Sequence, residues 1–264
     1  MSRNFEILQK AGRFRGLFAA EPAGIGRGRA QPVPCEIPLP SRPAPAKRPL
    51  QLELNGIGRE EAIRLVHRVF LANGKDSPRV VVFSGIERRV GCTWNCAWAA
   101  RALAAHVSGR VCAVDANLRH PSLHNEFGVE NSHGMVAALS GGSGVASYAS
   151  QLDDTNLWVL PSGTDGSDLC RVCTPVEMDL QLNELHSEFD YILIDSPALN
   201  TYADALALAQ MSDGLVLVMD SPSTQCEAAR RAKQNAEAHL VRVFGAVLNR
   251  SAPQVPDMLT RILK

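Results

Sequence analysis

The sequence predicts an α/β protein with a doubly wound, mainly parallel β-sheet and helices on both of its faces. Two observations predict this fold class: strand-like and helix-like segments alternate along the chain, and the strand-like segments are continuous apolar runs. A third is the stretch 80–107, in which the run VVVF leads through a Gly-containing turn into an Ala-rich segment. Strand, loop and helix in this order are the layout of a phosphate-binding P-loop.

Apolar spacing predicts the individual elements. Five residues recur at helical intervals and predict a first helix over 59–72 with one apolar face: Ala62, Leu65, Val66, Val69 and Phe70. Apolar runs predict strands over 80–83, 110–114, 157–160, 191–194, 214–219 and 241–248. The remaining predicted helices are an Ala-rich one that follows Gly91 and ends at Gly109, short ones within 121–127 and 134–140, longer ones over 175–188, 204–211 and 224–238, and a last turn at 258–263.

The N-terminal segment differs in composition from the rest of the chain. Residues 1–50 contain 9 Lys and Arg against 3 Asp and Glu, whereas the remainder contains 18 against 24. Residues 1–20 are a basic, weakly amphipathic arm, which suits either contact with an anionic membrane surface or a solvated tail. Eight prolines within 21–49 predict an extended linker, because proline removes backbone donors and restricts its neighbours. We therefore expect one folded domain over 50–264.

Composition also excludes several classes of protein. No apolar run approaches the ~18 residues of a membrane span. The N-terminus lacks the apolar core of a signal peptide, so the sequence predicts a cytoplasmic protein. The seven cysteines are an odd number spread over a mid-sized chain, which is not the pattern of a disulfide framework. Cys170 and Cys173 form a lone C-x-x-C without the second ligand pair that a zinc site needs.

The turn after the first strand carries part of a phosphate-binding motif. In G-x-x-x-x-G-K-[ST], backbone N–H groups wrap the phosphates, the Lys reaches the β- and γ-phosphates, and the hydroxyl contacts Mg²⁺. Gly91 and Thr93 are present here, but Cys92 stands in place of the Lys. Arg88 and Arg89 precede them and offer positive charge, although their side chains restrict the loop.

Polar residues also follow other predicted strands, where open parallel sheets bind their ligands. Asp115, with Asn117 two residues on, is placed to hold Mg²⁺-bound water or accept a proton, or simply to cap the next turn. Asp195 ends an apolar strand in the Walker B pattern, in which the carboxylate orients Mg²⁺ through water. Asn249 and Arg250 follow the last strand and are placed to touch a nucleotide base.

Five segments carry a resemblance to a known family. In chain order they are VCAVDANLRHPSLHNEFG, LWVLPSG, FDYILIDSPA, SDGLVLVMD and FGAVLNR. Together they resemble the bacterial tyrosine kinases (BY-kinases) of exopolysaccharide and capsule assembly, which belong to the MinD/ParA-like class of P-loop proteins. The resemblance covers about residues 57–250.

The resemblance implies roles for particular residues. From their positions in the loops we expect Arg88, Arg89, Gly91, Cys92, Thr93, Trp94, Asn249 and Arg250 at the nucleotide site, and the resemblance places Asn249 by the adenine. The catalytic set is Asp115, Asn117 and Asp195, with Asp115 near the attacking hydroxyl. Mg²⁺ is implied at Thr93, Asp115 and Asp195. Glu61 and Arg64 resemble the family's N-terminal oligomerisation motif, whose third basic position falls on His67 or, one residue late, on Arg68.

Four departures from the family pattern weaken the expected chemistry. Cys92 replaces the phosphate-binding Lys, Glu87 stands where the MinD-type signature lysine would fall, and Asn117 replaces the second Asp of the usual D-x-D. The family usually autophosphorylates a tyrosine-rich C-terminal tail, whereas this tail, SAPQVPDMLTRILK, has no tyrosine. The tyrosines of the whole chain are Tyr148, Tyr191 and Tyr202.

These departures favour a degenerate kinase relative. Phosphoryl transfer depends on positioning and charge stabilisation, and losing one preorganised electrostatic contact typically costs about 10²–10³ in rate. The sequence therefore predicts a protein that binds ATP or ADP with Mg²⁺ weakly or not at all, and that regulates or docks in polysaccharide export. Two alternatives stay open. One is an active, atypical tyrosine autokinase or ATPase that uses Arg88 or Arg89, and the other is a MinD/ParA-like positioning ATPase.

The partners follow from the resemblance. The family works beside a membrane polysaccharide co-polymerase whose cytoplasmic end activates the kinase, so we expect that partner, together with self-association. Residues 1–20 are the expected contact with the inner face of the plasma membrane. No nucleic acid is expected among the partners.

Overall fold

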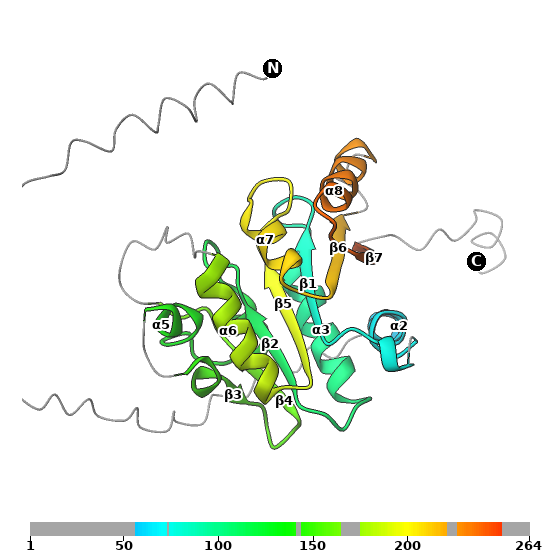
Figure 1. The fold of residues 1–264 in the computed structure, drawn as a ribbon. Coiled ribbons are helices and arrows are strands. Elements are labelled where there is room, and N and C mark those ends of the chain that lie inside the picture. Colours follow the sequence, from blue (N-terminus) through cyan, green and yellow to red (C-terminus); the bar gives the residue numbers. More distant parts are fainter. Residues whose placement is uncertain (1–55, 73, 141–143, 165–174, 221–225, 250–264) are drawn as a thin grey trace, which may run out of the picture. The chain divides into compact units, whose positions relative to one another are not determined.

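The computed structural model describes residues 56–72, 74–140, 144–164, 175–220 and 226–249 (Figure 1). Several predictions fall outside these residues. They concern the arm over 1–20, the linker over 21–49, Cys170 and Cys173, Arg250, and the helical turn at 258–263.

Seven strands form a single sheet in the order β3-β4-β2-β5-β1-β6-β7. Their bounds are β1 Val80–Gly85, β2 Val111–Asp115, β3 Ser150–Gln151, β4 Leu157–Leu160, β5 Tyr191–Ser196, β6 Gly214–Asp220 and β7 Val243–Asn249. Neighbouring strands pair in parallel, except that β3 runs antiparallel to β4. The predicted doubly wound, mainly parallel sheet is therefore confirmed. The pattern analysis missed β3, because a strand of two residues has no apolar run to reveal it.

The helices connect the strands as expected, with some differences at their ends. The α-helices are α2 Gly56–Val66, α3 Cys92–Ala104, α4 Leu123–Phe127, α5 Met135–Leu139, α6 Pro175–Glu188, α7 Asp204–Gln210 and α8 Cys226–Ala238. A π-helical turn η2 (His67–Leu71) continues α2, and 3₁₀ turns lie at η3 (Gly74–Asp76) and η4 (Val145–Tyr148).

The prediction that the second helix ends at Gly109 was wrong, because α3 ends at Ala104. The amide of His106 donates to the Leu103 carbonyl, three residues back, at 2.9 Å, which tightens the last turn and stops the α-helical ladder. Val107 nevertheless packs against the core from the turn that follows, half-buried.

Side chains of the central strands point alternately into two apolar layers. In β1, Val80 and Val82 face the layer covered by α6, α7 and α8, whereas Val81 and Phe83 face the layer covered by α2, α3 and α4. Helices lie on both faces of the sheet (Figure 1) and both apolar layers are buried, which is why these strands read as continuous apolar runs. Among the described residues, no helix combines the length and the apolar character needed to cross a membrane.

The strand order determines what meets at the carboxyl edge of the sheet. β5 lies between β1 and β2, and its Asp195 pairs with Phe83 on one side and with Asp115 on the other. The two carboxylates therefore come from equivalent positions on neighbouring strands. β1 ends two residues beyond Phe83, so the loop from β1 to α3 starts close to these carboxylates.

Candidate functional site

The loop between β1 and α3 requires glycine near both ends. A Cβ on Gly85 would lie 2.6 Å from Val90 Cγ2 and 2.7 Å from the Glu87 carbonyl oxygen. Gly91 has a φ of 85°, in the left-handed region, and a Cβ there would collide with the side chain of Asn249. Arg89 adopts the same region with a φ of 63°. The loop thus keeps a tight, glycine-dependent turn although its Lys is missing.

Two amide side chains hold this turn from behind. Asn249 Nδ2 donates to the Val90 carbonyl at 2.9 Å, and Asn95 Nδ2 donates to the Gly91 carbonyl at 2.8 Å. Asn249 comes from the end of β7 and Asn95 from the first turn of α3, so the loop is fixed to the sheet and the helix together. A contact of Asn249 with adenine stays a prediction, whereas its contact with the loop backbone is a feature that the sequence did not reveal.

Substituting Gly91 by Ala is expected to lower the free energy of unfolding by about 1–3 kcal/mol, because Cβ disfavours the left-handed φ and displaces Asn249. Gly245→Ala is the matched control: a Cβ at Gly245 in β7 meets nothing within 4 Å, so its effect should stay within about 0.5 kcal/mol. Urea unfolding of the wild type and of both variants measures these free energies. Equal effects would contradict the described loop.

Thr93 and Asp195 form the centre of the site. Thr93, in the first turn of α3, donates its hydroxyl to Asp195 Oδ2 at 2.7 Å, and its Oγ1 also lies 3.0 Å from Ser122 Oγ. The other oxygen, Asp195 Oδ1, is fully buried and has no hydrogen-bond partner among the described residues. A buried carboxylate oxygen without a partner is costly, and either a proton or a bound cation relieves that cost.

Asp115 anchors the segment that follows β2. Its Oδ2 accepts the amides of Ser122 and Leu123, both at 3.0 Å, and its Oδ1 accepts the amide of Asn117 at 3.1 Å. The carboxylate therefore caps the start of α4, which was the structural alternative for this residue, and holds Ser122 against Thr93. Capping and a role beside Mg²⁺ are compatible, because each oxygen has more than one acceptor direction.

Burial controls the protonation of these groups. Burial, reinforced by the negative charge of Asp115, raises the pKa of Asp195 to about 8, against the hydrogen bond from Thr93. Burial raises the pKa of Asp115 to about 6, with the three backbone amides opposing the shift. Burial and the neighbouring Asp195 raise the pKa of the Cys92 thiol, so Cys92 faces the site as a neutral thiol.

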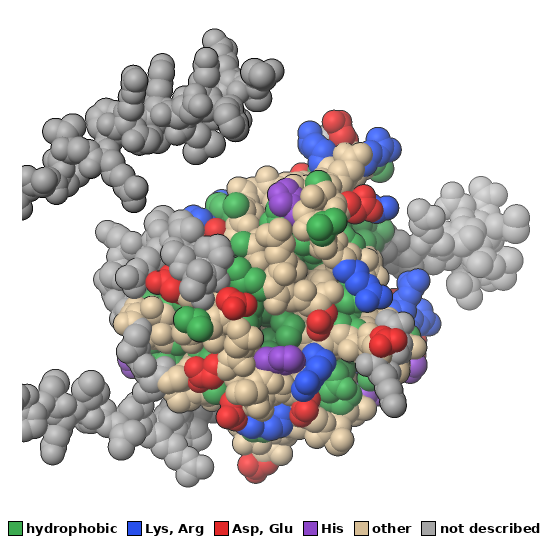
Figure 2. All heavy atoms as spheres, viewed as in Figure 1, with side chains coloured by type: hydrophobic (Ala, Val, Ile, Leu, Met, Phe, Trp, Pro, Cys, Tyr) green, Lys and Arg blue, Asp and Glu red, His purple; other side chains and the backbone are tan. Residues whose placement is uncertain are grey.

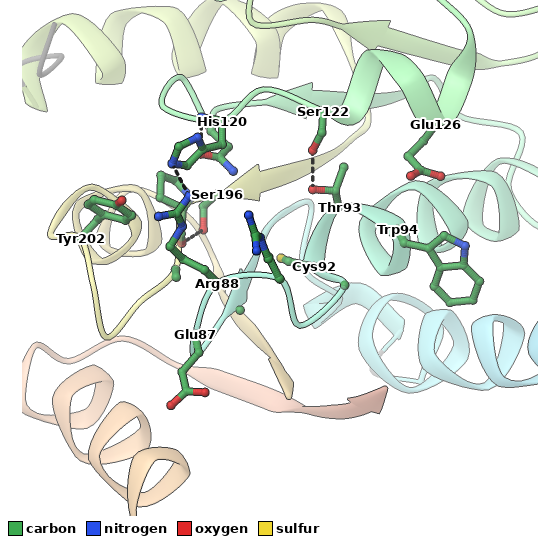
Figure 3. Close-up of a pocket in the computed structure, with 16 residues that line it drawn as sticks. Glu87, Arg88, Cys92, Thr93, Trp94, His120, Ser122, Glu126, Ser196 and Tyr202 are labelled. Carbon is green, nitrogen blue, oxygen red and sulfur yellow. Dashed lines mark hydrogen bonds between the residues drawn. The ribbon is translucent and has the colours of Figure 1, made fainter. Parts of the chain in front are cut away.

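A pocket of about 450 Å³ opens over these groups (Figure 3). Its lining includes seven residues predicted for the site, which are Arg88, Arg89, Gly91, Cys92, Thr93, Trp94 and Asn117. It also includes residues that were not predicted, among them His120, Ser122, Glu126, Ser196 and Tyr202. Figure 3 shows Arg88 reaching across to His120, whereas Trp94 and Glu126 lie toward the other end.

The other predicted residues lie apart from the pocket lining. Asp115 and Asp195 are completely buried, and Asn249 lies behind the loop. Glu61 and Arg64 form an exposed ion pair of 2.8 Å on α2, and Arg68 is exposed on η2. Their role in oligomerisation stays a prediction.

Exposed charges of both signs also lie on α8, where Arg231 pairs with Glu227 and Lys233 with Glu237 (Figure 2).

The residues present fit Mg²⁺ and a phosphate chain. Mg²⁺ prefers hydroxyl, carboxylate and water oxygens, and the Thr93 hydroxyl lies against a carboxylate with an unsatisfied oxygen. The N-terminus of α3, a helix of 13 residues, opens into the same pocket and favours anions. The positive charge that the Lys would bring is missing at Cys92.

The fold and the position of this site place the chain among proteins with the P-loop NTPase architecture. In solved structures it resembles the chimerical protein CapA2B2, with a TM-score of 0.68 and 22% identity over 76% of this chain and 88% of that one. It also resembles the cell division ATPase MinD of Pyrococcus furiosus, with a TM-score of 0.57 and 23% identity over 70% and 78% of the two chains. At such identities the likeness shows the fold.

Sequence comparison finds relatives that are named bacterial tyrosine-protein kinases, and one that is named a transport protein. Tyrosine-protein kinase YwqD of Bacillus subtilis is 29% identical over 140 residues, 53% of this chain and 59% of that protein. The succinoglycan biosynthesis transport protein ExoP of Rhizobium meliloti is 25% identical over 154 residues, 57% of this chain and 20% of that protein. The chain thus covers less than two thirds of YwqD. No protein-family model matches the sequence. The resemblance to the BY-kinases is confirmed.

Proposed function

We propose that this chain is a BY-kinase-like protein of exopolysaccharide or capsule assembly whose phosphoryl-transfer chemistry is degenerate, and that it acts by docking or regulation. The observation that carries the proposal is the neutral Cys92 thiol at the position of the phosphate-binding Lys. Around it the scaffold of the site is intact: the glycine-dependent loop, the Thr93–Asp195 contact and the Asp115 cap. The kinase relatives and the transport protein ExoP supply the biological context.

The retained groups support weak binding of nucleotide without efficient transfer. Thr93 and Asp195 would hold Mg²⁺, with Asp115 behind Ser122, and the N-terminus of α3 would receive phosphate oxygens. Bound Mg²⁺ supplies neutralisation of phosphate charge. Cys92 adds no charge at the phosphates, and Asn117 offers an amide where the D-x-D pattern has a carboxylate. The affinity for nucleotide is therefore expected to fall less than the rate of phosphoryl transfer.

An active kinase is the second candidate, and the positions of two arginines favour it. Arg88 and Arg89 both line the pocket, so either could supply charge to a phosphate there. The target tyrosine would lie on a partner or on this chain. Tyr202 lines the same pocket, while Tyr148 lies on η4 outside it.

Transfer of labelled phosphate from Mg·ATP decides between the two candidates. We expect the wild-type chain, alone or with a cytoplasmic peptide of the co-polymerase, to transfer phosphate to tyrosine no faster than Asp115→Asn does. Asn keeps an acceptor oxygen for the amides of Ser122 and Leu123 and loses only the hydrogen bond from the Asn117 amide, so this variant should fold. Robust wild-type transfer that Asp115→Asn abolishes would overturn the degenerate assignment and support the active kinase.

The expected partners belong to the same proposal. They are the cytoplasmic end of a membrane polysaccharide co-polymerase and further copies of this chain, the latter through Glu61, Arg64 and Arg68. Residues 1–20 would supply a peripheral contact with the inner face of the plasma membrane. Membrane fractionation of a chain without residues 1–20 tests that contact, and unchanged fractionation would count against it.

A further inference from the structure

Arg88 and His120 meet at the mouth of the pocket. Arg88 lies in the loop after β1 and His120 in the segment after β2, and Arg88 Nη2 lies 2.8 Å from His120 Nε2 (Figure 3). Both side chains are exposed, and both line the pocket that contains Thr93. The contact therefore joins the phosphate-binding loop between β1 and α3 to the segment that follows β2.

The chemistry of the two side chains fixes the direction of this hydrogen bond. A guanidinium carries only donors, so Arg88 donates and His120 Nε2 accepts with its lone pair. The ring proton is then on Nδ1, which makes that nitrogen a second donor. One N–H group of Arg88 is used by the neutral His120 ring. The remaining N–H groups and the positive charge are therefore available to a ligand.

Within the part of the chain that the structure describes, the positive charge of Arg88 has no acidic counter-charge close to it at this end of the pocket. Among the described residues no ion pair involves Arg88. Neighbouring Arg119 is different: its Nε lies 2.9 Å from Asp204 Oδ2 and its guanidinium stacks 4.6 Å from the Tyr202 ring. Of the carboxylates that line the pocket, Glu87 points away and Glu126 lies at the end near Trp94 (Figure 3). The buried Asp195 is engaged by Thr93.

We propose that Arg88 and His120 form a phosphate subsite, in which Arg88 supplies positive charge that α3 lacks at Cys92 and His120 supplies a hydrogen-bond donor. A phosphate group would replace His120 Nε2 as the acceptor for Arg88, which binds phosphate with two parallel N–H groups. His120 would turn to donate a hydrogen bond of its own. The ligand is a terminal phosphate, carried by a nucleotide or free as pyrophosphate. The inference rests on the proposed nucleotide pocket and adds its anion-binding residues.

Calorimetric titration of the full chain with pyrophosphate, Mg·ADP and Mg·ATP tests the subsite. We expect Arg88→Gln to weaken pyrophosphate and Mg·ATP binding by about tenfold to a hundredfold, since charged hydrogen bonds are lost. His120→Gln keeps a polar group and should cost a smaller factor. Arg230→Gln, on the exposed face of α8, removes the same charge elsewhere and should change nothing. Because Arg88 and His120 are exposed, neither variant should disturb folding.

The three ligands separate the two sources of phosphate. If Arg88 binds the terminal phosphate of a nucleotide, Arg88→Gln will abolish any preference for Mg·ATP over Mg·ADP. If it binds free phosphates, the loss will be as large for pyrophosphate alone. Either result supports the subsite. Unchanged affinities in Arg88→Gln, or no wild-type binding of any of the three ligands, would overturn it. Fast phosphate transfer by the wild type would overturn the degenerate assignment and leave the subsite standing.

Discussion

Replacing Cys92 by Lys is expected to raise the affinity for Mg·ATP by about a hundredfold. A charged hydrogen bond to a phosphate contributes about 1.5–3 kcal/mol, which corresponds to an affinity gain of up to about a hundredfold, and the rest of the phosphate-binding loop is already formed. Gly91 holds its left-handed turn, Asn95 and Asn249 fix the loop carbonyls, and Thr93 contacts Asp195. The new ammonium would enter at the first residue of α3, in the lining of the pocket.

The size of the gain also depends on Asp195. The Cys92 thiol lies close enough to Asp195 for each to shift the pKa of the other. A Lys at position 92 would favour the charged form of that carboxylate, and the pKa of Asp195 would fall from about 8. The variant should therefore bind Mg²⁺ more readily at neutral pH as well, because a metal must displace the proton from its ligand.

Cys92→Met is the matched control for this experiment, because it lengthens the side chain without adding charge. Binding of a fluorescent ATP analogue with Mg²⁺ should be weak in the wild type and in Cys92→Met, and strong only in Cys92→Lys. Equal binding by Lys and Met variants would mean that side-chain length, rather than charge, is what the site lacks. Tight wild-type binding would mean that the loop arginines already replace the Lys.

Sequence patterns were sufficient for the scaffold, because a sheet buried on both faces has a strong signal. Ile192, Leu193 and Ile194 are completely buried, and a run of such residues that stops at an aspartate predicts both the strand and its functional end. The same logic located Asp115 at the end of β2. Pattern analysis missed β3, because two residues carry no apolar run. It placed the end of α3 too late, because a single backbone hydrogen bond from His106 to Leu103 ends the helix.

The contacts within the candidate site could not be predicted in the same way. Thr93 and Ser122 are 29 positions apart, and Asn249 and Val90 are 159 apart, so their contacts depend on how whole strands are ordered. A motif gives residue types and spacing within one loop. The meeting of Arg88 and His120 needed two loops from strands that are separated by β5. The basic character of His120 was visible in the sequence, but its partner was not.

Substituting Asp195 by Asn is expected to stabilise the protein at pH 8 and to have little effect near pH 4. The pKa of Asp195 is about 8 in the folded protein and about 3.9 in an unfolded chain. Between these values the folded state binds a proton that the unfolded state releases. Wild-type stability therefore falls as the pH rises through this window. Asn does not titrate, so the stability of the variant does not fall with pH through this group.

The expected gain at pH 8 is about 2–5 kcal/mol, because one pKa unit corresponds to about 1.4 kcal/mol and buried carboxyl groups shift by up to about 3–5 units. Urea unfolding from pH 4 to 8 without Mg²⁺ measures it. Asp76→Asn, at an exposed position on η3, should retain the wild-type pH dependence. Mg²⁺ at pH 8 should stabilise the wild type and not Asp195→Asn, because only the carboxylate offers the buried Oδ1 as a charged ligand. Parallel pH profiles for the wild type and Asp195→Asn would show that folding does not raise the pKa of Asp195, which would contradict this prediction.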